Sequence, residues 1–250
     1  MRTLLSADQM EPPSRRCEDS APSGAAHHTV NPSAGAPSRR VLFRGLNSHT
    51  PVHITQQRLP HWVQEGVSYF VTFRLADSVP VHLQQQWQHE REAWLRFHPE
   101  PWSVEVEADY RRLFPERLDQ WLDAGMGECH LRRAEMRDAV DRHMRHLDGQ
   151  RYDVDAFVLM PNHVHLLITP RTGQELFALL KGIKGTSART VNKLLGRTGA
   201  SFWMEDSYNR IVRDSEELIA FRKYIEANPV KASLRPEEFT LAMQNILYVE

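Results

Sequence analysis

The sequence predicts an α+β protein organised around one largely antiparallel sheet, and three observations support this. Residues 67–75 alternate along the chain and are rich in β-branched and aromatic residues, which is typical of a half-buried strand. Residues 151–160 and 163–169 form two further strand-like runs, and the Pro161-Asn162 step between them is typical of a hairpin turn. The other periodic segments have helical spacing, and strands interleaved with helices favour a layered sandwich.

The chain divides into a leader and a folded part. Residues 1–55 are rich in Pro, Ser, Ala and Gly and lack apolar periodicity, so we expect a disordered leader that cannot bury enough surface to offset its ordering entropy. Residues 56–250 are expected to form a single domain. Apolar residues recur at helical spacing between the first strand and the hairpin, which predicts a helical insertion at about 81–147.

The elements after the hairpin are predicted in the same way. Residues 174–195 carry an apolar stripe and are expected to form a helix, and a strand is expected at 208–212. The last helix is expected to begin at Asp214, because Glu217 lies three residues further on in a capping-box arrangement. It is expected to end near residue 228, because the proline that follows disfavours helical backbone in the residue before it.

Composition limits the function classes. Hydrophobic residues at 41% and charged residues at 25% are ordinary for a globular protein, and the net charge of −1 argues against a protein that coats duplex DNA. The two cysteines do not form a Cys-x-x-Cys pair, so a thiolate zinc site is not expected. Neither a signal peptide nor a membrane span is evident, and we expect a cytoplasmic protein without membrane contact.

The hairpin carries the first candidate site. Side chains alternate faces along a strand, so His163 and His165 project from the same side of the sheet while Val164 points to the other. Two imidazoles fixed side by side on a strand are a good start for a metal site. The alternative is a chance pair of surface or partly buried histidines, and the motif alone does not decide between them.

The last predicted helix carries the second candidate site. Tyr224 and Asn228 are four residues apart and lie one above the other beside the apolar stripe of Leu218, Phe221 and Ile225. A phenol and a carboxamide therefore share one edge of the buried face. The alternative is that Tyr224 packs with its hydroxyl at the rim of the core and that Asn228 caps the end of the helix.

Two sequence blocks together resemble a known family. The block 160–167 (MPNHVHLL), followed by the block 224–232 (YIEANPVKA), resembles the signature pair of the REP-associated tyrosine transposases, relatives of the smallest insertion-sequence transposases. The resemblance runs from about residue 67 to about residue 234. Supporting matches occur at 69–73, at Arg151-Tyr152, at Phe202-Trp203 and at 211–214.

The resemblance implies a fold and a set of site residues. It implies a ferredoxin-like sandwich with helices on one face of the sheet, His163 and His165 as metal ligands, Asn228 as the third protein ligand and Tyr224 as the nucleophile. Two imidazoles and one amide oxygen leave positions open for water and phosphate oxygens, so Mg²⁺ or Mn²⁺ fits better than a closed zinc site. The ion would polarise the scissile phosphate.

The implied substrate is single-stranded DNA beside a hairpin-forming, REP-like repeat. Basic residues that could contact its backbone concentrate on the 174–195 helix, on the 208–212 strand and around the last helix, although a solvated basic surface is the commoner meaning of such groups. The candidates are Lys181, Lys184, Arg189, Arg210, Arg213, Lys223 and Lys231. We expect those on the 174–195 helix to adjoin the nucleophile.

The expected function is metal-dependent transesterification through a 5′-phosphotyrosine intermediate, which makes the protein an enzyme that cleaves and rejoins DNA. One alternative is a domesticated hairpin-binding protein without cleavage activity. Another is a metal-dependent hydrolase, which would leave Tyr224 without a task. The sequence is compatible with a monomer or a homodimer, and it does not identify the DNA sequence that is recognised.

Overall fold

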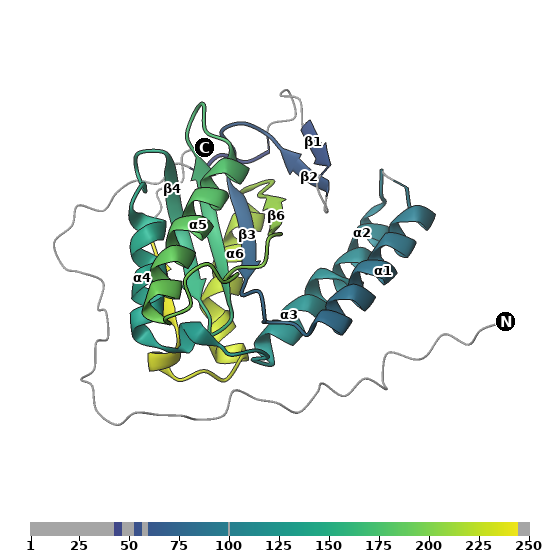
Figure 1. Cartoon of the computed structure of the whole chain (residues 1–250). Helices are drawn as coiled ribbons and strands as arrows, with labels where there is room; N and C mark the ends of the chain where they lie inside the picture. Colours follow the sequence, from purple (N-terminus) through teal and green to yellow (C-terminus); the bar gives the residue numbers. More distant parts are fainter. Residues whose placement is uncertain (1–42, 47–52, 57–59, 100, 245–250) are drawn as a thin grey trace. The chain divides into compact units, whose positions relative to one another are not determined.

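The structure is a computed structural model that describes residues 43–46, 53–56, 60–99 and 101–244 (Figure 1). Most of the predicted leader lies outside these residues. Its described part is packed rather than disordered: Phe43 and Leu46 contact the hydrophobic core, and the Ser68 amide donates to the Arg44 carbonyl at 2.8 Å. The boundary of the leader at residue 55 is therefore placed too late in the chain.

Two compact units divide the described residues. Residues 77–128 form a helical unit, and the preceding and following segments form a sheet unit. The helical unit contains α1 (Val81–Phe97), α2 (Val104–Leu113) and α3 (Pro115–Asp123). Helices α2 and α3 are separate because Pro115 stands at the start of α3 and cannot continue the hydrogen-bonding of α2.

The sheet unit is built on a five-stranded sheet with the order β6-β3-β5-β4-β7, and every neighbouring pair is antiparallel. The strands are β3 (Tyr69–Arg74), β4 (Tyr152–Leu159), β5 (His163–Pro170), β6 (Tyr208–Ile211) and β7 (Thr240–Met243). A separate two-stranded sheet joins β1 (His53–Gln56) to β2 (Pro60–Val63). The predicted α+β class with an antiparallel sheet is confirmed, whereas β1, β2 and β7 were not predicted.

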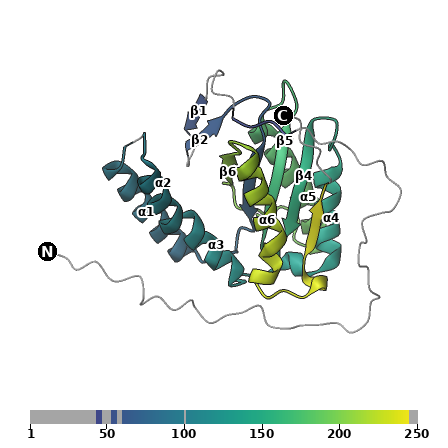
Figure 2. The same ribbon diagram turned by 180° about the vertical axis from the view of Figure 1, so that it is seen from behind.

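Helices cover both faces of the five-stranded sheet. Helices α4 (Ala134–Arg145) and α5 (Leu176–Leu194) lie on one face, and α6 (Ser215–Lys231) lies on the other, as the two opposite views show (Figures 1 and 2). The expectation of helices on one face is therefore corrected. The physical reason is that every residue of β5 is buried, so both faces of this strand lie under a covering layer.

Helix α4 belongs to the sheet unit. Its side chains Met136, Ala139, Val140 and Met144 are fully buried in the larger core cluster, together with residues of β3, β4 and β5. The separate helical unit thus ends at residue 128, and the last third of the expected 81–147 insertion is part of the core. Helical spacing identified α4 as a helix but contained no information about its packing partner.

The chain after α6 returns to the sheet. Two short 3-10 helices, η2 (His130–Arg132) and η3 (Pro236–Glu238), are joined by the buried Arg137, whose guanidinium donates to the carbonyls of Leu131 and Glu237 at 2.8 and 2.5 Å. This arrangement leads the chain into β7 at the sheet edge. None of the described helices is long and apolar enough to span a membrane.

Candidate active site

The two histidines of β5 lie side by side on the face that α6 covers. Their Nε2 atoms are 3.1 Å apart, and the rings meet at 77°. The β-hairpin fixes this geometry because the Met160 amide donates to the His163 carbonyl at 2.9 Å at the turn. The exposed fractions of the two side chains are only 1% and 0%, so neither histidine lies at the surface.

Each imidazole is oriented through its other nitrogen. The Nδ1 atom of His163 lies 2.8 Å from the Asn162 side-chain oxygen, and the Nδ1 atom of His165 lies 2.8 Å from the Thr72 hydroxyl on the neighbouring strand. Such partners fix the tautomer and the rotation of a ring, and they are the usual outer partners of histidine ligands. The two Nε2 atoms are left facing each other at 3.1 Å.

Burial keeps both imidazoles neutral. It lowers the pKa of His163 to about 3, with a smaller contribution from the positive charge of Lys231. Burial, the neighbouring His163 and Lys231 together lower the pKa of His165 well below its ordinary range. A neutral imidazole has a free lone pair, so both side chains are in the form that binds a cation at neutral pH.

This burial predicts acid sensitivity of the metal-free protein. Below pH 6.5 the unfolded chain protonates His163, whereas the folded chain does so only near its lowered pKa of about 3. The folded state should therefore lose up to about 1.4 kcal/mol of stability per pH unit as the pH falls from 6.5 towards 3. Urea unfolding at pH 7 and pH 5 in EDTA measures this loss. His163→Gln should reduce the difference between the two pH values, and an unchanged difference would contradict the assignment.

Helix α6 begins where the sequence predicted. The Asp214 carboxylate accepts from the Glu217 amide at 2.8 Å, while the Glu217 carboxylate accepts from the Arg213 amide at 2.7 Å. The helix continues through Pro229 to Lys231, so the expected end at residue 228 is wrong. The fixed φ of proline is compatible with helical backbone, and its cost here is one missing amide donor near the helix end.

An ion pair fastens α6 to the sheet. The Arg222 guanidinium donates to the Asp155 carboxylate of β4 and, at 2.8 Å, to the Gln244 carbonyl. Burial raises the pKa of Asp155 to about 6, although the Arg222 charge acts in the opposite direction. The pair is made by the residue two positions before Tyr224, and it therefore limits how far the tyrosine can move along the sheet.

Tyr224 lies against His165. The ring centroids are 5.1 Å apart with the planes at 75°, and Phe70 of β3 contacts both rings at 5.6 and 5.8 Å. The Lys231 ammonium, two turns further along α6, lies 5.9 Å from the centre of the Tyr224 ring. The structure thus brings together the nucleophile candidate, the histidine pair and one of the predicted basic residues.

Asn228 provides the test of whether a cation fits here. Its side chain is 1% exposed, and neither its oxygen nor its nitrogen has a hydrogen-bond partner among the described residues. An unsatisfied buried amide costs about 1–3 kcal/mol, so such a group needs an explanation. Because α6 continues to Lys231, Asn228 is not at the helix end, and the interpretation as a cap is wrong.

The donor set fits a divalent cation. The 3.1 Å between the two Nε2 atoms is close to the separation of two adjacent ligands that each lie about 2.1 Å from one octahedral ion. No group of three or more His, Cys, Asp or Glu that could hold a metal occurs in the described part of the chain. The orphaned Asn228 amide, one helical turn beyond Tyr224, is the candidate for a further oxygen ligand.

The predicted basic residues separate into two groups. Lys181, Lys184 and Arg189 are on α5, which covers the opposite face from α6, so the expectation that this helix adjoins the nucleophile is wrong. Periodicity could not reveal which face a helix would cover. Arg210 and Arg213 both bind the Glu217 carboxylate, at 2.7 and 3.3 Å, and Lys223 is exposed on α6. Of the seven, Lys231 is the one placed at the Tyr224 ring.

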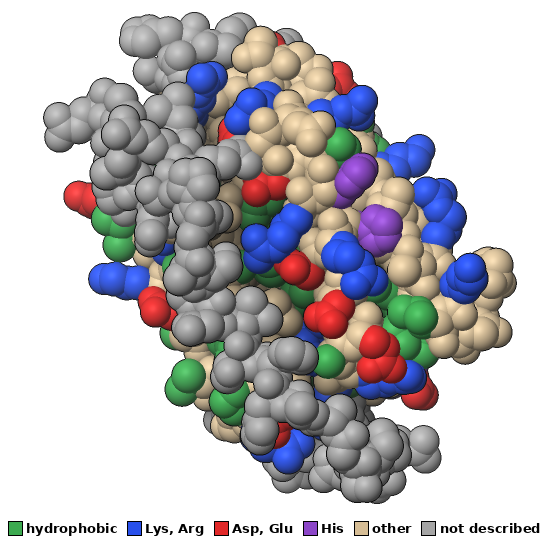
Figure 3. Space-filling view, turned by 90° about the vertical axis from the view of Figure 1, so that its left-hand side faces the viewer, with side chains coloured by type: hydrophobic (Ala, Val, Ile, Leu, Met, Phe, Trp, Pro, Cys, Tyr) green, Lys and Arg blue, Asp and Glu red, His purple; other side chains and the backbone are tan. Residues whose placement is uncertain are grey.

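Sequence reasoning missed the residues that support the pair. Thr72 and Phe70 alternate along β3 and could be assigned to one face, but only the register of β3 with β5 shows that this face is the one with the histidines. Charges at the surface are mixed: lysine and arginine side chains alternate with acidic ones on the face drawn in Figure 3. A uniformly basic surface is not evident on that face.

Two of three comparisons find known proteins that are similar to this chain. Residues 131–228 match the family model of IS200-like transposases. A REP-associated tyrosine transposase bound to a REP hairpin matches in structure with 16% identity, a TM-score of 0.39, and coverage of 70% of this chain and 74% of that chain. A candidate transposase from Deinococcus radiodurans matches with 17% identity, a TM-score of 0.31, and coverage of 66% and 93%. No curated protein matches the chain.

The family match covers the segment that carries the candidate site. The hairpin with the paired histidines and most of the tyrosine-bearing helix lie within it, and it contains His163, His165, Tyr224 and Asn228. This segment is similar to the IS200-like transposase family, and the match supports a transposase-like function. The two structural matches have TM-scores below 0.5, so the account of this chain does not depend on them.

Proposed function

We propose that the chain is a metal-dependent transesterase that cleaves and rejoins single-stranded DNA beside hairpin-forming repeats. The observation that carries the proposal is the contact of Tyr224 with His165 of a buried, neutral histidine pair, with the orphaned Asn228 amide one helical turn beyond Tyr224. A phenol beside two cation ligands fits nucleophilic attack on a phosphate better than it fits packing alone. Action on chromosomal DNA also agrees with the expected cytoplasmic location.

The bond changes are balanced without an external energy source. The Tyr224 oxygen attacks the phosphorus, the bond from phosphorus to the 3′ oxygen breaks, and the 3′ oxygen takes up a proton while the phenol loses one. The product is a 5′-phosphotyrosine link and a free 3′-hydroxyl. Attack of a 3′-hydroxyl on the same phosphorus reverses these changes, so strands can be rejoined.

The residues of the chain have separate tasks in this proposal. His163, His165 and Asn228 would hold Mg²⁺ or Mn²⁺, and the ion supplies charge that polarises the phosphate and stabilises the transition state. Thr72 and Asn162 orient the two rings. Lys231 places a positive charge 5.9 Å from the centre of the Tyr224 ring, where it adds to the potential that attracts a phosphate.

The orphaned amide gives a specific prediction. Asn228→Leu should weaken Mn²⁺ binding by roughly 10-fold to 100-fold, because it removes the only neutral oxygen ligand proposed here. Asn228→Asp should retain or strengthen binding, because a carboxylate keeps the oxygen and adds charge. Titration of Mn²⁺ monitored by electron paramagnetic resonance checks both variants. Equal affinities for Asn228→Leu and the unchanged chain would show that Asn228 is not a ligand.

A covalent adduct tests the proposed function. A labelled single-stranded hairpin from the DNA that flanks the gene is incubated with the protein and either Mn²⁺ or EDTA, and the products are separated on a denaturing gel. We expect a protein–DNA band that requires Mn²⁺ and disappears in Tyr224→Phe. Binding on a native gel without any adduct would favour the hairpin-binding protein, and cleavage that survives Tyr224→Phe would favour the hydrolase.

A further inference from the structure

Arg74 is a buried cation on the same face of the sheet as the two histidines. It is the last residue of β3 and pairs with His163 of β5, two residues beyond the pair of Thr72 with His165. The contacts of Thr72 and Phe70 with His165 establish which face these alternate residues occupy. Side chains paired in this way have Cβ atoms about 5 Å apart, so the Arg74 side chain begins beside the His163 ring.

The guanidinium is largely removed from water. Arg74 is 9% exposed, and burial lowers its pKa to about 10, with the Asp206 carboxylate acting in the opposite direction. It therefore stays charged at neutral pH. A planar guanidinium with a fork of donors matches phosphate oxygens in geometry, and it is the side chain best suited to a desolvated phosphate contact.

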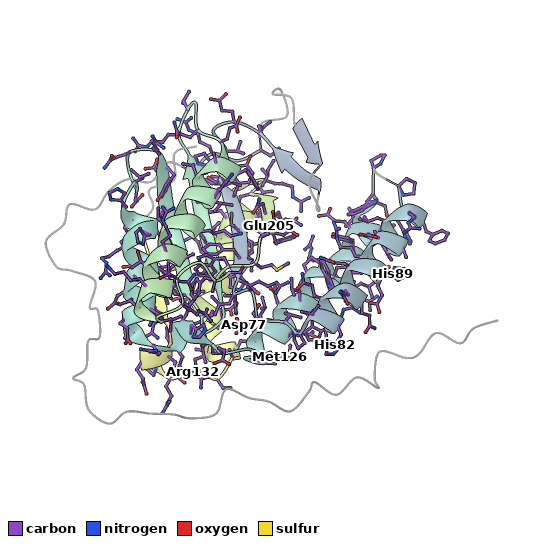
Figure 4. All side chains as sticks on the ribbon, viewed as in Figure 1. Asp77, His82, His89, Met126, Arg132 and Glu205 are labelled. Carbon is purple, nitrogen blue, oxygen red and sulfur yellow. The ribbon has the colours of Figure 1, made fainter. Side chains whose placement is uncertain are left out.

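Residues 203–207 support the end of β3 at Arg74. The Met204 amide donates to the Arg74 carbonyl at 2.8 Å, and Leu75 pairs with Trp203. The Lys184 ammonium donates to the Glu205 carbonyl at 2.6 Å and to the Ser207 hydroxyl at 3.2 Å, so it holds both neighbours of Asp206 (Figure 4, where Glu205 is labelled). Asp206 is thereby placed where its charge acts on both Arg74 and Lys184.

Two cations lie near the histidine pair. The Lys231 charge acts on both imidazoles, and Arg74 is the register partner of His163 on β3, with its own charge opposed by Asp206. A bound divalent cation would add positive charge at the histidines, which favours an anion there. In a protein that acts on DNA, that anion is a backbone phosphate.

We propose that Arg74 binds a non-bridging oxygen of the DNA phosphate held at the His163–His165 pair, with Asp206 and the Lys184-braced segment 205–207 orienting its guanidinium. The inference deepens the proposed transesterase function and names the residue that fixes the phosphate. Lys184 thereby acts through the 205–207 segment rather than as a DNA contact on the far face of α5.

The test uses the full chain with Tyr224→Phe, which removes covalent capture, and a fluorescent hairpin oligonucleotide with Mn²⁺. Neutral methylphosphonates replace single phosphates of the unpaired nucleotides one at a time, and anisotropy reports affinity. We expect one position to lose roughly ten-fold or more in affinity. Adding Arg74→Gln should lower the affinity for the unmodified oligonucleotide to a similar degree. In this variant, the methylphosphonate at the sensitive position should change the affinity by less than about two-fold.

Matched variants separate a contact from a general loss of charge or folding. Arg171→Gln removes an arginine at the opposite end of β5, where it pairs with Asp153 at 2.9 Å, and it should keep the full methylphosphonate effect. Arg74→Lys keeps the charge but not the fork and should recover only part of the affinity, and it replaces Arg74→Gln in the comparison if that variant does not fold. An unchanged effect of the sensitive position in both Arg74 variants would overturn the inference.

A second measurement separates this inference from the proposed function. Inorganic phosphate is added to the Mn²⁺-loaded chain, and its ³¹P relaxation reports phosphate near the ion. We expect phosphate relaxation to be faster in the unchanged chain and in Arg171→Gln than in Arg74→Gln. This result supports the phosphate contact even if no DNA adduct forms in the unchanged chain. Equal relaxation with Arg74→Gln and the unchanged chain, or no phosphate effect in either, overturns it even if the adduct does form.

Discussion

Replacing His165 with glutamine is expected to lower the rate of covalent adduct formation roughly 100-fold to 1000-fold, which is typical for loss of a group that stabilises transition-state charge. His165 is fully buried, its Nε2 atom lies 3.1 Å from that of His163, and its ring contacts Tyr224. The substitution therefore removes a proposed metal ligand and alters the surface against which the nucleophile rests.

The control for His165→Gln is His89→Gln, because His89 is exposed on α1. Initial rates of adduct formation at saturating DNA and Mn²⁺ should be unchanged in His89→Gln. Parallel Mn²⁺ titrations should show weakened binding in His165→Gln alone. A His165→Gln chain that forms adduct at the unchanged rate would refute the assigned role of the pair.

Truncating Phe70 is expected to have the second large effect, on both stability and activity. Phe70 is 4% exposed, and it stacks on Phe221 at 4.3 Å and contacts His165 and Tyr224. Phe70→Ala should lower the free energy of unfolding by about 3–5 kcal/mol, because it removes a buried ring and leaves a cavity beneath α6. Urea unfolding measures this loss.

A second substitution at this position separates packing from catalysis. Phe70→Leu keeps most of the buried volume and should cost less than about 1.5 kcal/mol, yet it removes the ring that faces both His165 and Tyr224. The rate of adduct formation should therefore fall clearly, while the free energy of unfolding changes little. Phe97→Ala is the control because Phe97 is 82% exposed. Full activity in Phe70→Leu would show that the ring contributes packing alone.

Local patterns predicted the elements that present the site. Strand alternation placed His163 and His165 on one face, and the capping signal at Asp214 located the start of α6. Four-residue spacing placed Tyr224 and Asn228 together. These relations depend on backbone geometry over a few residues, and sequence reports such geometry well.

Relations between distant elements were not predictable in the same way. The register that sets Thr72 and Arg74 opposite the histidines joins residues about ninety positions apart, as the 93-residue separation of Thr72 and His165 shows. Every residue of β5 is buried, so both faces of this strand are covered. The sequence does not indicate which helix covers which face. Phe43 and β7 were missed because short segments have little periodicity to detect.

The central claim is that Tyr224 becomes covalently attached to DNA. Mass spectrometry of the protease-digested adduct, formed with a hairpin oligonucleotide and Mn²⁺, identifies the modified residue directly. The account predicts a 5′-phosphonucleotide on the peptide that contains Tyr224 and a free 3′-hydroxyl on the released strand. A nucleotide on any other residue, or cleaved DNA with no modified peptide, would contradict it.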